Sequence, residues 1–397
     1  MVTIDQIYSA RDRLRGIARI TPLNPTKSLG PNIYIKSENL QLTGAFKLRG
    51  AYNKLACLSD EEKAKGVIAC SAGNHAQGVA LSATKLGIRS VVCMPAAAPI
   101  SKIHATENYG AEVVLVPGTY DDAAAKAAEL AKEHGYTFAH PFDDEYVIAG
   151  QGTIGIEILE QLPEVQQVVV PIGGGGLIAG IALAIKTLRP SCKIIGVQAA
   201  GAPSMYKAVK EGQISTLPHV STIADGIAVK RPGDLTFELV KKYVDDVVVV
   251  DDNQVAAAIV ALMEDQKTVA EGAGACAVAA VLSGLVDAEN MKTVCVVSGG
   301  NVDMTTLSRI INKGLVTFGR ICQVSVQITD KPGGLVALLQ TIAQTGANVV
   351  SVTHARRAKN CELGACVISM GLETHDHQHI ERIKLALEEA GYDAQFK

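Results

Sequence analysis

The sequence predicts an α/β fold, with a two-lobed first domain of open, mostly parallel sheets and a small ferredoxin-like domain after it. Between residues 30 and 300, short β-branched runs alternate with Ala-rich stretches, which is typical of parallel sheets covered by helices. Several runs lead directly into a glycine or serine turn and then a helix, where open α/β sheets bind ligands. After about Gly319 the runs alternate apolar and polar residues, as half-buried strands do.

The expected strands of the first part share valine- and isoleucine-rich runs; they are 67–70, 90–94, 112–116, 168–172, 193–197, 247–250 and 293–297. We expect a first domain over residues 1–319, with a smaller lobe of roughly residues 45–150 inserted in the larger one. A second domain over residues 321–397 has the order βαββαβ. Its expected elements are strands at 321–328, 348–353 and 364–370, helices at 335–344 and 377–390, and a short last strand.

Composition excludes several classes of partner. The chain has 397 residues with 37 basic and 40 acidic side chains, and no basic block that would bind nucleic acid. The uncharged stretch 165–185 is interrupted by Pro171 and four glycines, so we expect no membrane span there. Nine cysteines without a Cys-x-x-Cys pair, and a start unlike a signal peptide, indicate reduced thiols and a cytoplasmic location.

Lys47 is the first candidate for chemistry, because it lies between Phe46 and Leu48. Burial disfavours the charged form of a lysine, and the neutral amine can condense with an aldehyde. The segment also fits an ordinary amphipathic helix with a solvated lysine. The segment alone leaves both interpretations open.

A run of four glycines, Gly173 to Gly176, lies between an expected strand and an expected helix over 178–186. Successive backbone N–H groups and a helix N-terminus favour a phosphate at such a turn. The run lacks the Gly-Lys-Ser/Thr ending of a nucleotide loop. A dinucleotide loop is disfavoured because Gln198 lies where a ribose-binding acid is expected, whereas a tight packing turn remains an alternative.

Two further turns follow expected strands. In the loop from Ser71 to His75, backbone N–H groups and a hydroxyl could hold a carboxylate, although Ser71 and Asn74 could equally be helix caps. Ser298 follows the strand 293–297 and precedes two glycines. Glu271 precedes another glycine-containing helix start and is either a site residue or a first-turn charge.

Together these motifs resemble fold-type II pyridoxal-phosphate enzymes, and most closely the threonine dehydratase family. The resemblance rests on the segments 45–50, 71–75, 173–176 and 298–301, in the family's order, and covers roughly residues 5–315. The tail from Gln323 resembles an ACT domain, an amino-acid-sensing module, through the segments 330–334 and 346–349.

The resemblance implies pyridoxal 5'-phosphate as the cofactor and a role for each matching residue. Lys47 matches the Schiff-base lysine beside Phe46, Asn74 matches the ligand of the cofactor's phenolic oxygen, and Ser298 matches the residue facing the pyridine nitrogen. The phosphate would be held by Gly173, Gly174, Gly175, Gly176 and Leu177, and the substrate carboxylate by Ser71, Ala72, Gly73, Asn74 and His75. Ala45 departs from the family's usual serine, so no hydroxyl role applies there.

The resemblance also implies a reaction, in which L-threonine loses water and ammonia to give 2-oxobutanoate, and L-serine gives pyruvate. Such an enzyme serves isoleucine synthesis or threonine breakdown. Lys47 would remove the Cα proton. A neutral Ser298 should not keep the pyridine nitrogen protonated, which favours prompt loss of a β-leaving group.

Two alternatives differ in class. A serine racemase of this family places a second serine where this chain has Ala72. Gln198 replaces a carboxylate of that relative's divalent-cation site, so we expect no required divalent metal, whereas a monovalent cation remains open. A non-catalytic amino-acid sensor would not need Lys47. The histidines of 375–379 fit a solvated helix start better than a metal site.

The ACT-like tail predicts regulation. A branched-chain amino acid such as isoleucine or valine is expected at Pro332, Gly333, Gly334 and Asn348, across the interface of a homodimer or homotetramer.

Overall fold

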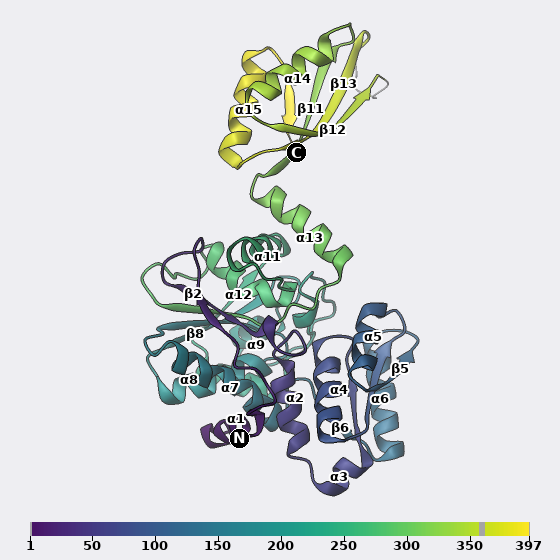
Figure 1. Ribbon diagram of the computed structural model, residues 1–397, viewed down its shortest axis with the longest axis vertical. Coiled ribbons are helices and arrows are strands. Elements are labelled where there is room, and N and C mark those ends of the chain that lie inside the picture. Colours follow the sequence, from purple (N-terminus) through teal and green to yellow (C-terminus); the bar gives the residue numbers. More distant parts are fainter. Residues whose placement is uncertain (1, 357–361, 397) are drawn as a thin grey trace. The chain divides into compact units, whose positions relative to one another are not determined.

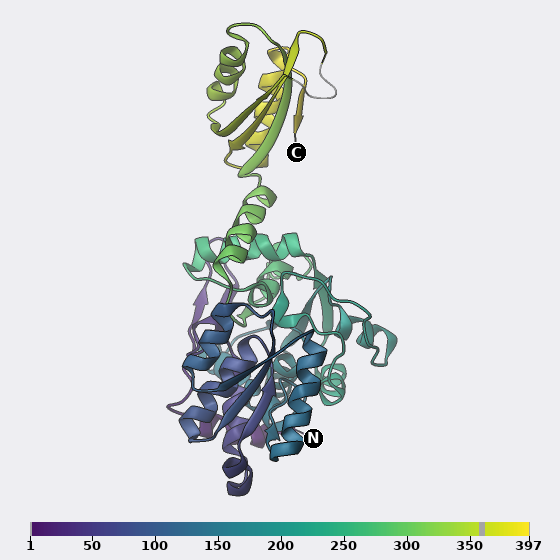
Figure 2. The ribbon, with the colours of Figure 1, turned by 90° about the vertical axis from the view of Figure 1, so that its right-hand side faces the viewer.

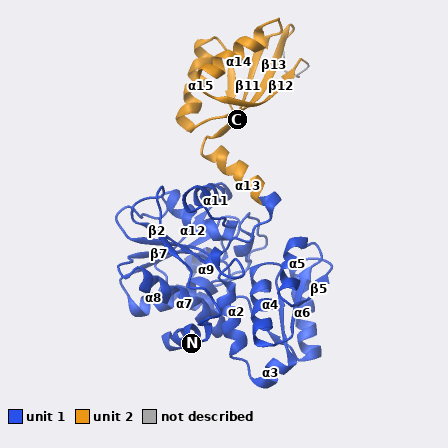
Figure 3. Cartoon of the chain, viewed as in Figure 1, with its two compact units in different colours: residues 1–306 blue, residues 307–397 orange. Residues whose placement is uncertain are grey.

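The computed structural model describes residues 2–356 and 362–396, and the chain forms two compact units, Met1–Thr306 and Leu307–Lys397 (Figure 3). The division falls earlier than the expected boundary near residue 319. The reason is helix α13 (Met304–Thr317), most of which belongs to the second unit. Strand β11, the first of the second unit's sheet, begins at Ile321.

The larger lobe of the first unit contains a six-stranded sheet of order β1-β2-β10-β7-β8-β9 (Figure 1). Its strands are β1 (Leu23–Pro25), β2 (Ile33–Ser37), β7 (Gln167–Pro171), β8 (Lys193–Ala199), β9 (Asp246–Val250) and β10 (Thr293–Val297). Only β1 pairs antiparallel with its neighbour. The four strands expected between residues 168 and 297 therefore form one parallel sheet, and β1 and β2 extend it at one edge.

Helices cover both faces of this sheet. Every residue of β7 and β10 is buried. Val168 and Val170 pack with Ile178 of helix α8, and Cys295 Sγ donates to the carbonyl oxygen of Ala277 in helix α12 at 3.8 Å. Cover on both faces explains why these strands are continuous apolar runs.

The smaller lobe contains a four-stranded parallel sheet of order β5-β4-β3-β6. Its strands are β3 (Val67–Cys70), β4 (Ser90–Pro95), β5 (Glu112–Val116) and β6 (Thr137–Phe138). Alternate residues of β4 pack on opposite helices: Val91 and Cys93 on α6, Val92 and Met94 on α4. Figure 2 shows these helices on the two sides of the strands. This lobe lies in sequence between β2 and β7 of the larger sheet.

The helices of the first unit are α1 (Ile4–Leu14), α2 (Lys47–Ala56), α3 (Asp60–Lys65), α4 (Asn74–Leu86), α5 (Ile100–Asn108), α6 (Tyr120–His134), α7 (Glu145–Gln161), α8 (Gly176–Leu188), α9 (Ser204–Glu211), α10 (Asp234–Tyr243), α11 (Asp252–Gln266) and α12 (Gly272–Leu282), with short 3-10 helices at Glu38–Leu40 and Asp225–Ile227. No helix within residues 2–356 and 362–396 has the length and apolar character needed to cross a membrane. The uncharged stretch 165–185 forms β7, a glycine turn and part of α8.

The second unit forms the expected βαββαβ domain. Its antiparallel sheet has the order β12-β13-β11-β14, and its elements after α13 are β11 (Ile321–Thr329), α14 (Gly334–Gln344), β12 (Asn348–Ala355), β13 (Ala365–Glu373), α15 (His377–Glu389) and β14 (Ala394–Phe396). In β11 and β13, buried residues alternate with more accessible ones. The buried face packs on Leu338 of α14 and on Ile383 of α15.

Candidate active site

The predicted site residues lie where parallel strands end. Ser71 follows β3, Gly173 follows β7 by two residues, and Ser298 follows β10 directly. The carboxyl ends of the strands in open α/β sheets are the usual position of a ligand site. Contacts between the segments that carry these residues bring them together in the first unit.

Lys47 is the first residue of α2 and is not a freely solvated side chain. Its Nζ donates to the carbonyl oxygen of Pro141 at 2.6 Å and lies 5.3 Å from the centre of the Phe46 ring. Burial lowers the pKa of Lys47 to about 8, although the carboxyl group of Glu271 acts in the opposite direction. About a tenth of the amine is therefore neutral at pH 7, far more than for a solvated lysine, and the neutral form is what a nucleophile or a base requires.

Glu271 belongs to this site, although the sequence left its role open. Its side chain is buried and does not cap α12; instead, its Oε1 accepts a hydrogen bond from Asn74 Nδ2 at 2.7 Å. Burial and the nearby Asp225 raise the pKa of Glu271 to about 8. The group is thus mainly a neutral carboxylic acid at pH 7, which can donate a hydrogen bond as well as accept one.

Asn74 is held from two sides. Besides its bond to Glu271, its Oδ1 accepts from Asn301 Nδ2 at 2.9 Å, and the same Asn301 amide donates to the carbonyl oxygen of Thr43 at 2.7 Å. Asn301 formed part of a sequence motif but received no role. Its position directly after paired glycines gave no signal of this contact, which depends on the approach of two loops.

The loop from Ser71 to His75 turns into α4 without a side-chain cap. Gly73 is the N-cap residue, and Ser71 Oγ accepts from the Gly73 N–H at 3.2 Å. His75 Nε2 lies 2.8 Å from the carbonyl oxygen of Ala139, and burial, with the nearby Lys47, lowers the pKa of His75 to about 3. His75 is therefore neutral at physiological pH. Ala72 contributes no titratable group to the loop.

The glycine run ends at the start of a helix. Gly175 has a φ of +102°, and α8 begins at the next residue, so the run places backbone N–H groups at a helix N-terminus, where an anion is favoured. Packing also requires glycine, because a Cβ added to Gly174 would lie 2.4 Å from the Phe142 ring, and one on Gly176 would lie 2.9 Å from the Phe142 carbonyl oxygen. Phe142 is next to Pro141, the hydrogen-bond partner of Lys47.

Ser298 connects the Lys47 segment to the loop of Asn74. Its side chain is buried, and its carbonyl oxygen accepts from the Phe46 N–H at 3.1 Å. The next residue, Gly299, forms a β-bridge with Ala45, and its carbonyl oxygen accepts from the Glu271 N–H at 3.1 Å. A Cβ at Gly299 would lie 2.5 Å from Glu271 Oε1, so no larger residue fits there.

A buried ion network fixes the helix that carries Lys47. Arg49 donates through Nε to Glu38 Oε2 at 2.8 Å and through Nη1 to Glu157 Oε1 at 2.5 Å, and Lys36 Nζ donates to Glu157 Oε2 at 2.6 Å. Burial opposes the charge of Arg49, but the two carboxylates outweigh it and raise its pKa. The sequence did not identify this network, because its members lie on α2, on α7, on β2 and in the 3-10 helix that follows β2.

Gln198, which replaces an expected carboxylate, has a structural role. It is fully buried, donates to the carbonyl oxygen of Ile172 at 3.2 Å and accepts from the Tyr206 N–H at 2.7 Å.

These residues fit a phosphate-bearing aldehyde. Lys47 supplies an amine with a lowered pKa, and the loop ending at Gly176 supplies N–H groups at a helix start. Gly299 offers a surface without a side chain beside Asn74. These connected loops thus supply hydrogen-bond donors for a phosphate and for a phenolic oxygen. They also supply an amine that can form a Schiff base with the aldehyde carbon.

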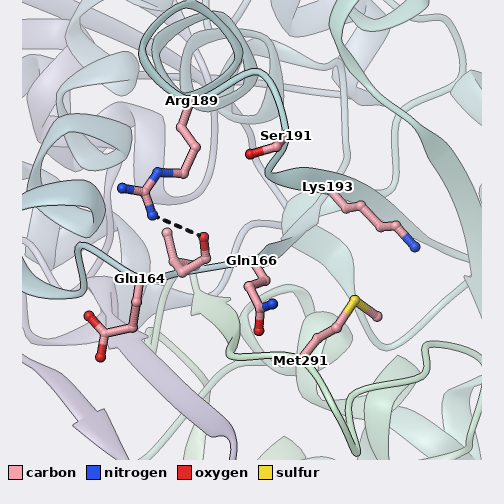
Figure 4. Close-up of a pocket in the computed structure, with 7 residues that line it drawn as sticks. Glu164, Gln166, Arg189, Ser191, Lys193 and Met291 are labelled. Atoms are coloured by element: carbon pink, nitrogen blue, oxygen red, sulfur yellow. Dashed lines mark hydrogen bonds between the residues drawn. The ribbon is translucent and has the colours of Figure 1, made fainter.

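A separate cavity of about 290 Å³ lies at the opposite ends of β7 and β8 (Figure 4). It is lined by Glu164, Val165, Gln166, Arg189, Ser191, Lys193 and Met291. Gln166 precedes β7 and Lys193 begins β8, so this cavity faces the amino ends of the strands. It is therefore distinct from the candidate active site.

The second unit has a cavity of about 320 Å³ at the loop between β11 and α14. Pro332 and Gly333 line it, and Gly334 is the first residue of α14. Asn348 lies at the other end of the sheet, where its Nδ2 donates to Glu373 Oε2 at 2.7 Å. Within one chain, therefore, Asn348 does not join the other three residues expected at an effector site.

Comparisons with known proteins agree with this geometry. Residues 14–299 match the model of the family described as pyridoxal-phosphate dependent enzyme. The chain is 50% identical over 397 residues to an L-threonine ammonia-lyase of Thermotoga maritima, and the match covers 99% of each chain.

Two solved structures resemble the first unit. A threonine deaminase of Solanum lycopersicum is 40% identical with a TM-score of 0.74, over 78% of this chain and 93% of that one. A serine racemase of maize is 37% identical with a TM-score of 0.74, over 80% of this chain and 98% of that one. The chain belongs to the family of pyridoxal-phosphate-dependent enzymes, in its threonine dehydratase group of fold type II.

Proposed function

We propose that this enzyme converts L-threonine to 2-oxobutanoate and ammonia, and L-serine more slowly to pyruvate. One observation carries the proposal. The amine of Lys47, with a pKa of about 8, lies beside two loops at helix starts, one suited to a phosphate and one suited to a carboxylate. The relative from Thermotoga maritima that matches the whole chain bears the name of the first activity.

We assign the cofactor-holding roles as follows. Lys47, beside Phe46, binds the cofactor covalently; Gly173 to Gly176 and Leu177 hold its phosphate; Asn74 donates to its phenolic oxygen; and Ser298 faces its ring nitrogen. When bound, pyridoxal phosphate withdraws electrons from the Cα of the amino acid and makes the Cα proton removable.

Substrate positioning falls to the loop from Ser71 to His75. Its N–H groups and the Ser71 hydroxyl bind the substrate carboxylate, and the neutral state of His75 avoids a buried charge there. With the cofactor bound, the amine of Lys47 in its neutral form would take the Cα proton. A positioned base of this kind contributes roughly 100- to 10,000-fold to the rate.

Ser298 and Ala72 select the outcome. The Ser298 hydroxyl carries no charge, so it does not stabilise a protonated ring nitrogen as an aspartate would. With such a neutral partner, the bound cofactor would favour loss of the protonated β-hydroxyl group as water over transamination. Ala72 has no proton to deliver to the face opposite Lys47, which disfavours racemisation, the activity named for the similar maize protein.

The direct test is an assay of 2-oxobutanoate from L-threonine and of pyruvate from L-serine, with D-serine formation measured in parallel. We expect the first product to form fastest and D-serine to be absent. Rapid racemisation with little 2-oxobutanoate would favour the racemase interpretation instead. Absence of all three products would favour an amino-acid sensor.

For the second unit we propose regulation by a branched-chain amino acid at the cavity of Pro332 and Gly333, in a cytoplasmic homodimer or homotetramer. Support comes from the cavity itself and from β12, a sheet edge on which Val350 and Val352 are exposed. Exposed edge strands readily pair with a second chain. Calorimetry of the full chain with isoleucine and with valine tests this, and absence of heat from both would contradict it.

A further inference from the structure

Three potential metal ligands meet at one end of the C-terminal sheet. They are Asp330, directly after β11, His354 on β12 and Cys366 on β13. Their ligand atoms all lie within 4.8 Å of one another, and all three residues line the cavity of about 320 Å³. No sequence pattern indicated this set of three potential ligands, because its members are distant along the chain.

The strand register explains why the three side chains share a face. Cys366 is paired with Ile328, and Asp330 lies two residues after Ile328. His354 is paired with Ile368, two residues after Cys366. Paired residues of antiparallel strands, and residues two apart on one strand, point to the same side of a sheet. That side is the one packed on α14 and α15, since Ile328, Ile368 and Cys366 belong to the buried core.

The three groups differ in their access to solvent. Cys366 is only 1% exposed, whereas the side chains of His354 and Asp330 are 33% and 30% exposed. His354 Nε2 lies 3.9 Å from Asp330 Oδ1, and Arg356 Nε forms an ion pair with Asp330 Oδ2 at 2.8 Å. Arg356 also donates through Nη2 to Asp330 Oδ1 at 3.3 Å, but its side chain is 67% exposed, so solvent screens this ion pair and a cation can compete for the aspartate.

We propose that Asp330, His354 and Cys366 bind a divalent transition-metal ion of the zinc class. Thiolate and imidazole ligands select such ions over magnesium or calcium. Three protein ligands leave a coordination position open, and here the open position faces the cavity. The proposal does not depend on the effector proposed for the same cavity, because metal binding can be measured without any amino acid.

The test uses the full-length holoenzyme after dialysis against a chelator. Cobalt(II) is titrated in, and its visible d–d bands are read at wavelengths longer than those at which the cofactor absorbs. We expect one cobalt ion per chain, the intense bands of a four-coordinate site with a thiolate ligand, and loss of these bands on addition of zinc.

Matched variants locate the ion. Cys366→Ser and His354→Gln should each weaken cobalt binding by more than about tenfold, the usual minimum cost of losing even an outer-sphere partner. Cys322→Ser, at another buried cysteine of the same sheet, and His375→Gln should bind as the parent does. If Cys366→Ser does not fold, the accessible His354→Gln decides the question. Absence of four-coordinate bands in the parent, or unchanged binding in His354→Gln, would overturn the proposal.

Discussion

The two principal sheets of the molecule bury their residues differently. In the six-stranded sheet, β7 and β10 are buried along their whole length, because helices cover both faces. In the C-terminal sheet, β11 alternates buried and accessible residues, and on its outer face Ser325 and Ser369 are hydrogen-bonded at 3.0 Å.

This difference determines where chemistry is possible. Where helices cover both faces of a sheet, only the strand ends are left for a ligand. Groups placed there have shifted pKa values, as Lys47 and Glu271 do. A charge inside such layers needs partners, and Arg49 has two carboxylates. The one-sided sheet instead leaves an accessible edge and an open cavity, which suit binding and assembly.

The largest effect on activity should come from the first unit, where the candidate active site lies at the strand ends. Lys47→Ala should lower 2-oxobutanoate formation by at least about 100-fold, since it removes the proposed base. After borohydride reduction in the presence of pyridoxal phosphate, mass spectrometry should show the added pyridoxyl group on the parent and on Lys54→Ala, a control on the same helix. Retention of that mass by Lys47→Ala would contradict the assignment.

The second largest effect concerns stability. Arg49→Met leaves the buried Glu38 without its ion-pair partner and leaves Glu157 with Lys36 alone, so it should lower the free energy of unfolding by about 3–5 kcal/mol. Arg89→Met breaks an ion pair with Glu112 whose side chains are 63% and 54% exposed, and it should cost less than about 1 kcal/mol. Denaturant unfolding of the apoprotein, followed by circular dichroism, compares the two. Equal losses would show that burial does not set the cost.

A third effect depends on pH. Because the pKa of Glu271 is about 8 in the folded chain, well above the 4.5 that is usual for a glutamate, the folded protein keeps a proton that the unfolded chain loses between these values. The stability that this proton provides is present below about pH 4.5 and is lost as pH rises through about 8.

Glu271→Gln, which still accepts from Asn74, does not titrate. Its stability relative to the parent apoprotein should therefore rise with pH across this window, by about 1.4 kcal/mol for each unit of pKa shift at most. Thermal unfolding at several pH values measures the difference. Glu129→Gln, at an exposed carboxylate, should show no such trend, and a flat difference for Glu271→Gln would argue against the raised pKa.

The smallest effect belongs to the open sheet. Val352→Lys places a charge on edge strand β12, where valine is 42% exposed, and should weaken self-association without altering the fold of either unit. Leu385→Lys, on α15 and 57% exposed, is the control. Sedimentation velocity distinguishes them, and equal assembly of both variants would place the interface elsewhere.

The sequence alone determined the fold class and many of the elements, although not β1, β2 or β6. Alternation of period two predicted β11 and β13, and continuous apolar runs followed by glycine turns predicted β7 and β10 with loops at their ends. These signals are local, because the pattern of apolar and polar residues within one segment indicates whether one face or both faces of the strand are buried. For the same reason, the loops at Ser71, Gly173 and Ser298 were found before any contact between them was known.

Only the tertiary structure decided what depends on pairs of distant residues. Lys47 could equally have been a solvated lysine until Pro141 and Glu271 were placed around it, and the pKa of Glu271 depends on burial that no neighbour in sequence reveals. The Arg49 network and the group of Asp330, His354 and Cys366 arise where separate strands and helices meet. Sequence spacing encodes the face of an element, whereas ion pairs, pKa shifts and ligand sets require the distance between elements.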